Sequence, residues 1–154
     1  MSSASTSRAG ENGIMNRLAR VLFLFALSVT SSFGQNAHTP PAGSAERKGI
    51  MDVLRVPCEA DLGQNVIFRV QHLRVAGGWA FARVVPIQPN GTEIDYSRTK
   101  YAEAEAAGAF DAEGEALLRK KDGAWRVLEW RFGASDTEVE LWLERYRFPR
   151  TILG

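Results

Sequence analysis

Side chains suited to acid–base chemistry are concentrated in one short stretch of the chain. Asp95 and Asp111 are carboxylates, Tyr96 and Tyr101 are phenols, and Phe110 adds an aromatic face. A carboxylate with a raised pKa can act as a general base, and a phenol can donate a hydrogen bond. Asp95 and Asp111 are therefore candidate catalytic residues, and Tyr96, Tyr101 and Phe110 are candidate ligand-binding residues. The same residue types also suit turns, caps and tyrosines packed on a sheet, and that interpretation stays open.

Other kinds of chemistry lack the residues they need. Two His and one Cys are too few for a zinc or copper site of ordinary ligand count, so we predict no metal. The chain has no Gly-x-Ser-x-Gly elbow and no glycine-rich phosphate loop, and we predict no cofactor. The formal charge of +1, from 19 basic and 18 acidic side chains, provides no field to gather nucleic acid.

The candidate residues lie in a long excursion, residues 86–114, between two predicted β-hairpins. Pro86, Pro89 and the dipeptide Asn90-Gly91 predict loop and turn structure at its start, and an Ala- and Glu-rich stretch after Tyr101 predicts a short helix. Loops longer than about 12–15 residues are uncommon in compact domains and are often functional. The excursion is thus the predicted location of the site.

The first predicted hairpin precedes the excursion. Alternating apolar residues predict a strand over residues 66–75, with a bulge near Gln71 and His72 where the alternation slips by one. A turn over residues 76–78 leads to a second, antiparallel strand over residues 79–85.

The second predicted hairpin turns at Asp122-Gly123. In its last strand, Leu128, Trp130 and Phe132 alternate out of phase with Trp125 and Val127. This pattern predicts large apolar groups on both faces, so the strand is expected either to be central and covered on both sides or to line a pocket.

Two helices complete the predicted domain. Ser44 can cap a helix that ends at Gly63, and Pro57 predicts a break or kink near Val56. Ser135 and Glu138 match the capping box of a final helix with its apolar side on the sheet. The predicted fold class is α+β: an N-terminal helix packed on a curved antiparallel sheet of about four strands, with a short C-terminal helix.

The N-terminal region predicts export. A nine-residue apolar run, residues 21–29 with one serine at Ser28, follows Arg17 and Arg20 and precedes a small-residue stretch, which is typical of a secretory signal peptide. We predict a signal peptide over residues 1–34, with Met15 as the initiator, then a flexible spacer over residues 35–43 and a single domain over residues 44–154. The apolar run is shorter than the ~20 residues a membrane span needs, so no integral segment is expected after cleavage.

Four stretches of the chain carry a family resemblance. Residues 46–55, 78–81, 95–101 and 116–120 resemble a group of small exported bacterial proteins with no assigned activity. The resemblance covers nearly all of residues 46–150 and implies a periplasmic or extracellular location, with no functional residue to transfer. The element order also resembles cystatin-like folds, including nuclear-transport-factor-2-like domains, although the inhibitor motif Gln-x-Val-x-Gly is absent.

Three functional hypotheses follow. The favoured one is an exported, non-catalytic binding or interaction module of the bacterial envelope, with an unknown protein, glycan or small ligand as partner. The second is a small enzyme of the pocketed cystatin-like class that uses a carboxylate base. The third is a structural envelope component that assembles through exposed edge strands.

Overall fold

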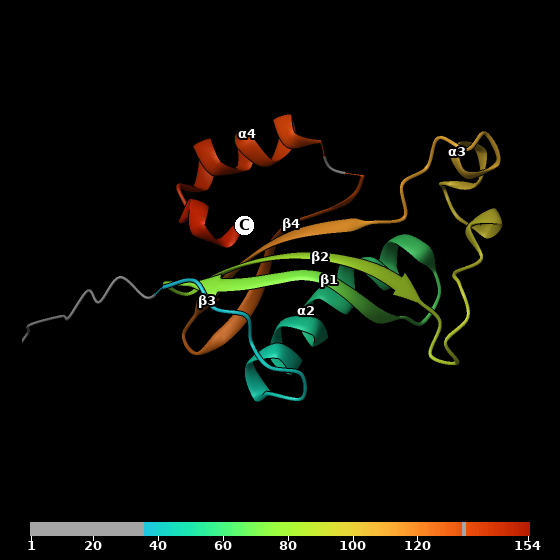
Figure 1. Ribbon diagram of the computed structural model, residues 1–154. Coiled ribbons are helices and arrows are strands. Elements are labelled where there is room, and N and C mark those ends of the chain that lie inside the picture. The colour runs from blue at the N-terminus through green and yellow to red at the C-terminus, as the bar shows by residue number, and fades with distance from the viewer. Residues whose placement is uncertain (1–35, 134) are drawn as a thin grey trace, which may run out of the picture. The chain divides into compact units, whose positions relative to one another are not determined.

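A computed structural model of the chain describes residues 36–133 and 135–154, which form one antiparallel sheet with helices on both faces (Figure 1). The predicted signal peptide and the predicted start at Met15 lie outside the described residues. The elements are α2 (Ala45–Leu62), β1 (Ile67–Ala76), β2 (Trp79–Ile87), the 3-10 helix η1 (Tyr96–Arg98), α3 (Ala102–Ala106), β3 (Gly114–Lys121), β4 (Ala124–Phe132), α4 (Asp136–Tyr146) and the 3-10 helix η2 (Arg150–Ile152). The strand order β1-β2-β3-β4 confirms the predicted α+β class.

Helix α2 begins and ends where the sequence predicts but does not break. The Ser44 hydroxyl accepts from the Arg47 backbone N–H at 3.2 Å, and Gly63 closes the helix with a φ of 65°. Of the predicted break or kink near Val56, the break is wrong, because α2 continues through Pro57. An interior proline costs about 3 kcal/mol. Packing offsets this cost, since buried residues lie on both sides of the proline: Ile50, Leu54, Cys58 and Leu62.

The β1–β2 hairpin confirms the predicted bulge. Its register shifts between Val70 and His72, which leaves Gln71 unpaired. The tight turn consists of Gly77 and Gly78, with φ values of 57° and 76°. Such angles are costly for residues with a side chain, so glycine is required there.

The two faces of the sheet carry separate cores. On one face, α2 packs on side chains that include Leu73, Val84 and Leu118. On the other, α4 and the C-terminal turn pack on Phe81 and Leu117, with Trp142 and Ile152 buried. Figure 1 shows this layering, with α4 above the sheet and α2 below it. Helix α4 has the predicted capping box.

A bulge corrects the prediction for β4. Its register with β3 shifts at Leu128, so Glu129 pairs with Leu117 while Val127 pairs with Leu118. The extra residue shifts the alternation of the side chains by one position, so Trp130 packs in the same α2-facing core as Trp125 and Val127. The strand therefore does not carry its large apolar groups on opposite faces. It lies at the edge of the sheet, not at its centre.

Residues 36–43, which belong to the predicted spacer, contact the domain. His38 and Val75 form an antiparallel bridge with hydrogen bonds of 2.9 and 2.8 Å. The Arg74 guanidinium donates to the Ala37 carbonyl, and Pro40 is buried. These contacts cover part of the outer edge of β1.

Candidate interaction surface

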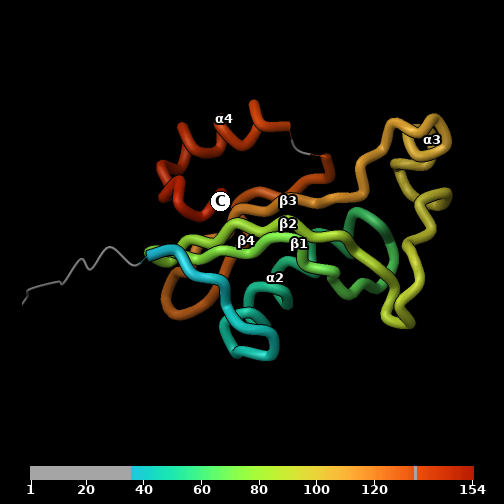
Figure 2. Tube along the Cα trace, in the orientation of Figure 1, coloured from blue at the N-terminus to red at the C-terminus, as the bar shows by residue number. Residues whose placement is uncertain are grey.

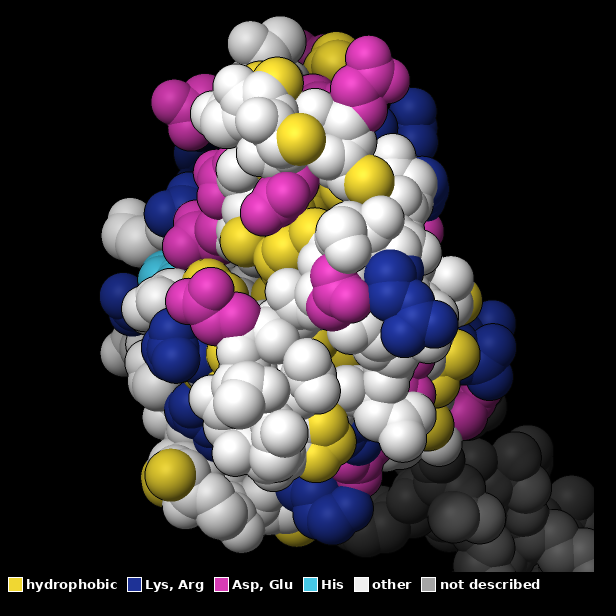
Figure 3. Space-filling view, turned by 90° about the vertical axis from the view of Figure 1, so that its right-hand side faces the viewer, with side chains coloured by type: hydrophobic (Ala, Val, Ile, Leu, Met, Phe, Trp, Pro, Cys, Tyr) yellow, Lys and Arg dark blue, Asp and Glu magenta, His cyan; other side chains and the backbone are white. Residues whose placement is uncertain are grey.

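The three predicted ligand-binding residues come together at one end of the sheet. The excursion leaves β2, passes through η1 and α3 and returns to β3 at this end (Figure 2). The Phe110 ring lies 4.7 Å from the Tyr96 ring and 4.7 Å from the Tyr101 ring, and Tyr101 lies 5.2 Å from Phe132, between ring centroids. Viewed from this end, apolar side chains gather in a hollow among acidic side chains (Figure 3).

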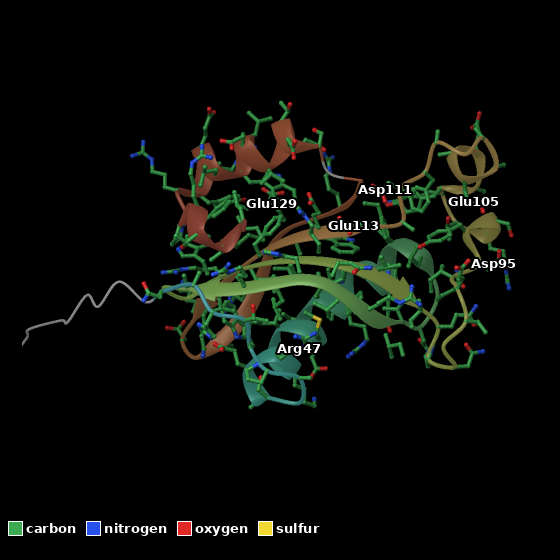
Figure 4. The ribbon with its side chains drawn as sticks, in the orientation of Figure 1. Arg47, Asp95, Glu105, Asp111, Glu113 and Glu129 are labelled. Atoms are coloured by element: carbon green, nitrogen blue, oxygen red, sulfur yellow. The ribbon has the colours of Figure 1, made fainter. Side chains whose placement is uncertain are left out.

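The two predicted catalytic carboxylates do not join this cluster as free groups. Asp95 is exposed and caps η1, with Oδ1 accepting from the Ser97 backbone and hydroxyl at 3.2 and 2.5 Å. Asp111 is also exposed and accepts from the Glu113 backbone at 2.9 Å. Figure 4 places both on the excursion, with Asp95 at its outer side. Both carboxylates thus act in turns, the alternative that the sequence left open.

A different carboxylate, Asp61, holds the excursion to α2. Its Oδ1 accepts from the Lys100 ammonium at 2.5 Å, and its Oδ2 accepts from the Trp130 indole at 3.1 Å and from the Tyr101 hydroxyl at 3.4 Å. The Lys100 ammonium also lies 5.2 Å from the centroid of the Tyr101 ring. Asp61 therefore joins α2, the excursion and β4 at one point.

An apolar groove extends from Asp61 between α2 and the edge strand β4. It has a volume of about 700 Å³, and Asp61 is its single charged lining residue. The helix side is formed by Val53, Val56, Pro57 and Ala60, and the strand side by Val127, Leu128 and Trp130. Most of the Val56 surface is exposed (68%), and Leu128 is 37% exposed. The expectation that the last strand lines a pocket is met here.

The helix side of the groove is a second apolar stripe of α2. Val53, Val56, Pro57 and Ala60 are spaced i, i+3, i+4 and i+7, so they share one helix face. This stripe is distinct from the buried stripe that faces the sheet. In the described part of the chain, only β3 pairs with β4, so the outer backbone groups of β4 face away from the sheet beside this stripe.

The titratable groups near the groove are not activated for nucleophilic chemistry. Burial, together with the nearby negative charges of Asp61 and Glu59, raises the pKa of the Cys58 thiol to about 12. The reactive form of a cysteine is the thiolate, so Cys58 acts as a buried apolar residue. Burial also raises the pKa of Tyr96 to about 12, and its buried hydroxyl has no described hydrogen-bond partner. In the described residues, no three His, Cys, Asp or Glu side chains converge as metal ligands would.

Sequence reasoning missed Val56, Ala60, Asp61 and Leu128. The spacing of the second stripe was a usable signal for the helix residues. The sequence also contained a signal for Asp61, because a negative charge in the last turn of a helix is unfavourable next to the helix dipole and needs a positively charged or hydrogen-bonding partner. Leu128 had no local signal, because the bulge that exposes it depends on pairing with β3.

Comparison of the chain with models of protein families, with curated proteins and with solved structures finds no match. Among the described helices, none combines the length and the apolar character that crossing a bilayer requires.

Proposed function

We propose that the protein is an exported, non-catalytic interaction module that binds a partner through the groove between α2 and β4. The observation that carries this proposal is the exposure of an apolar stripe next to an edge strand. Soluble proteins rarely leave contiguous apolar surface uncovered unless it meets a partner. Val56 and Leu128 lie on opposite sides of the same groove, so one partner surface can cover both.

Binding is favoured over catalysis by the state of Asp61. A general base needs a free lone pair aimed at a substrate proton. Asp61 already accepts three hydrogen bonds, one at Oδ1 from Lys100 and two at Oδ2 from Trp130 and Tyr101, so most of its roughly four acceptor sites are occupied. The groove is also open, whereas sites for small substrates usually enclose most of the ligand. The chemistry at the groove is therefore that of a contact surface.

Export and the cystatin-like relationship form part of the proposal. The basic residues, short apolar run and small residues of positions 17–34 support secretion. A helix packed against an antiparallel four-stranded sheet supports the cystatin-like class. Protease inhibition is not part of the proposal, because the chain lacks the inhibitor motif.

The test is selective capture by the mature protein, residues 35–154, immobilised and exposed to envelope extract of the producing cell. Val56→Asp places a charge in the groove, while Leu141→Asp places one at an apolar residue of α4 that is 54% exposed and lies outside the groove. We expect a species that wild type and Leu141→Asp retain and Val56→Asp loses. Equal retention by all three proteins would show that the groove is not the binding surface.

A further inference from the structure

The groove and the edge strand together fit one kind of partner. We propose that a second copy of this chain covers them, with β4 of one copy pairing antiparallel to β4 of the other. This inference rests on the proposed function, because it names the partner of the same surface. A two-fold axis perpendicular to the sheet keeps both α2 helices on one side, so each helix stripe faces the other across the axis.

The bulge at Leu128 restricts the possible registers. On β4, Trp125, Val127 and Trp130 face α2. Glu129 and Arg131 face α4, since they pair with Arg145 and Glu138 of that helix. Arg126 lies on the α4 side as well, because it pairs with Arg119, whose guanidinium stacks over Trp79 of the α4-facing core.

Near the centre of β4, two registers place residues opposite each other whose side chains lie on the same side of the sheet. In the first, Val127 lies opposite Leu128 of the second copy, and Arg126 lies opposite Glu129 of the second copy. In the other, Val127 lies opposite Trp130 of the second copy, and Arg126 lies opposite Arg131 of the second copy. Opposite charges on directly paired residues stabilise a sheet and like charges destabilise it, so charge selects the first register.

The charges needed for that register are available. Arg126 is exposed and has no carboxylate partner among the described residues. Glu129 accepts from Arg145 at 3.0 Å and from Tyr146 at 2.7 Å, both at Oε1. Its Oε2 is thus left for a further donor. Figure 4 shows Glu129 between the sheet and α4.

The side chains nearest the two-fold axis are apolar. Val127 and Leu128 meet at the axis of this register. Val56, Pro57 and Ala60 present short side chains, which allow two helices to approach closely. Pairing of the two β4 edges also satisfies backbone groups that the described chain leaves unpaired, which removes the hazard of an open sheet edge.

The inference is tested by sedimentation of the mature protein over about a hundred-fold range of concentration, where mass action separates monomer from dimer. We expect wild type to associate into a dimer. Arg126→Glu and Glu129→Lys each place like charges opposite each other, so each alone should weaken the dimer about ten-fold or more. An equimolar mixture of the two variants restores both opposite-charge pairs and should regain the wild-type association.

The possible outcomes separate the two proposals. A wild-type monomer at every concentration overturns the second copy as partner, while selective capture by the groove would still support the proposed function. Tighter association of Arg126→Glu would indicate the register with Arg126 opposite Arg131 and overturn the one proposed. If Glu129→Lys fails to fold by circular dichroism, Val56→Asp takes its place, with Leu141→Asp as control. Only Val56→Asp should then weaken the dimer, and equal association of both variants would overturn the proposal.

Discussion

At the residue scale, one buried carboxylate makes the stability of the domain depend on pH. Glu115 of β3 is only 5% exposed and accepts from the Arg83 guanidinium at 2.6 Å, while its Oε2 has no described partner. Burial raises the pKa of the Glu115 carboxyl, and Arg83 partly opposes that shift. The charged form is thus disfavoured in the fold despite the ion pair, as expected when desolvation exceeds the electrostatic attraction.

We predict that Glu115→Gln removes this pH dependence. In the unfolded chain Glu115 loses its proton at the ordinary glutamate pKa of about 4.3, whereas in the folded chain it keeps its proton to a higher pH. Between these two pKa values the folded state binds more protons, so the free energy of unfolding falls as pH rises. Glutamine has no proton to lose. The free energy of unfolding in urea, Gln variant minus wild type, should therefore increase with pH across this window. Glu144→Gln, at an exposed position of α4, is the control, and an unchanged or decreasing difference for Glu115→Gln would refute the prediction.

At the element scale, glycine has opposite roles in α2 and β3. At Gly49 of α2, an added Cβ would lie 3.6 Å from Trp125 Cδ1, which is ordinary contact. At Gly114 of β3, it would overlap the six-membered ring of Trp130. The absence of a side chain at Gly114 therefore leaves room for the Trp130 ring, which lines the groove and donates its indole N–H to Asp61.

We predict that the two glycine-to-alanine substitutions change stability in opposite directions. Gly49→Ala should stabilise the domain by about 0.5–1 kcal/mol, because alanine is the better residue in a helix. Gly114→Ala should destabilise it by about 1–3 kcal/mol, because overpacking forces Trp130 to move. Urea unfolding of the two variants measures both values. Equal effects of the two substitutions would contradict the described packing of Trp130.

Patterns of neighbouring residues predicted most of the helices, strands and turns, whereas features that depend on contacts between distant residues could not be predicted from the sequence. The hairpin turns, the bulge beside His72 and the capping box of α4 depend on neighbouring residues, so the sequence predicted them. The bulge at Leu128 depends on the register with β3, and the continuity of α2 through Pro57 depends on packing against the sheet. The same reason limited what could be predicted of the groove: none of the predicted ligand-binding residues lines it, and Tyr101 reaches it only through its hydrogen bond to Asp61, a contact that depends on the fold.

At the scale of the whole molecule, the helices leave one edge of the sheet open. Helix α2 covers one face, α4 and η2 cover the other, and the bridge at His38 covers part of the β1 edge. Within residues 36–133 and 135–154, the outer side of β4 has no such cover. An interaction at this edge therefore explains the exposure of Val56 and Leu128 by a single cause.

The most direct test of this explanation is site-specific photo-crosslinking in the producing cell. A photoreactive residue replaces Leu128 in one strain and Leu141 in another, and the adducts are resolved by mass. We predict an adduct at position 128 and none at position 141, with the adduct at twice the mass of the chain if the partner is a second copy. Absence of any adduct at position 128, or equal adducts at both positions, would contradict the assignment of the α2–β4 groove as the binding surface.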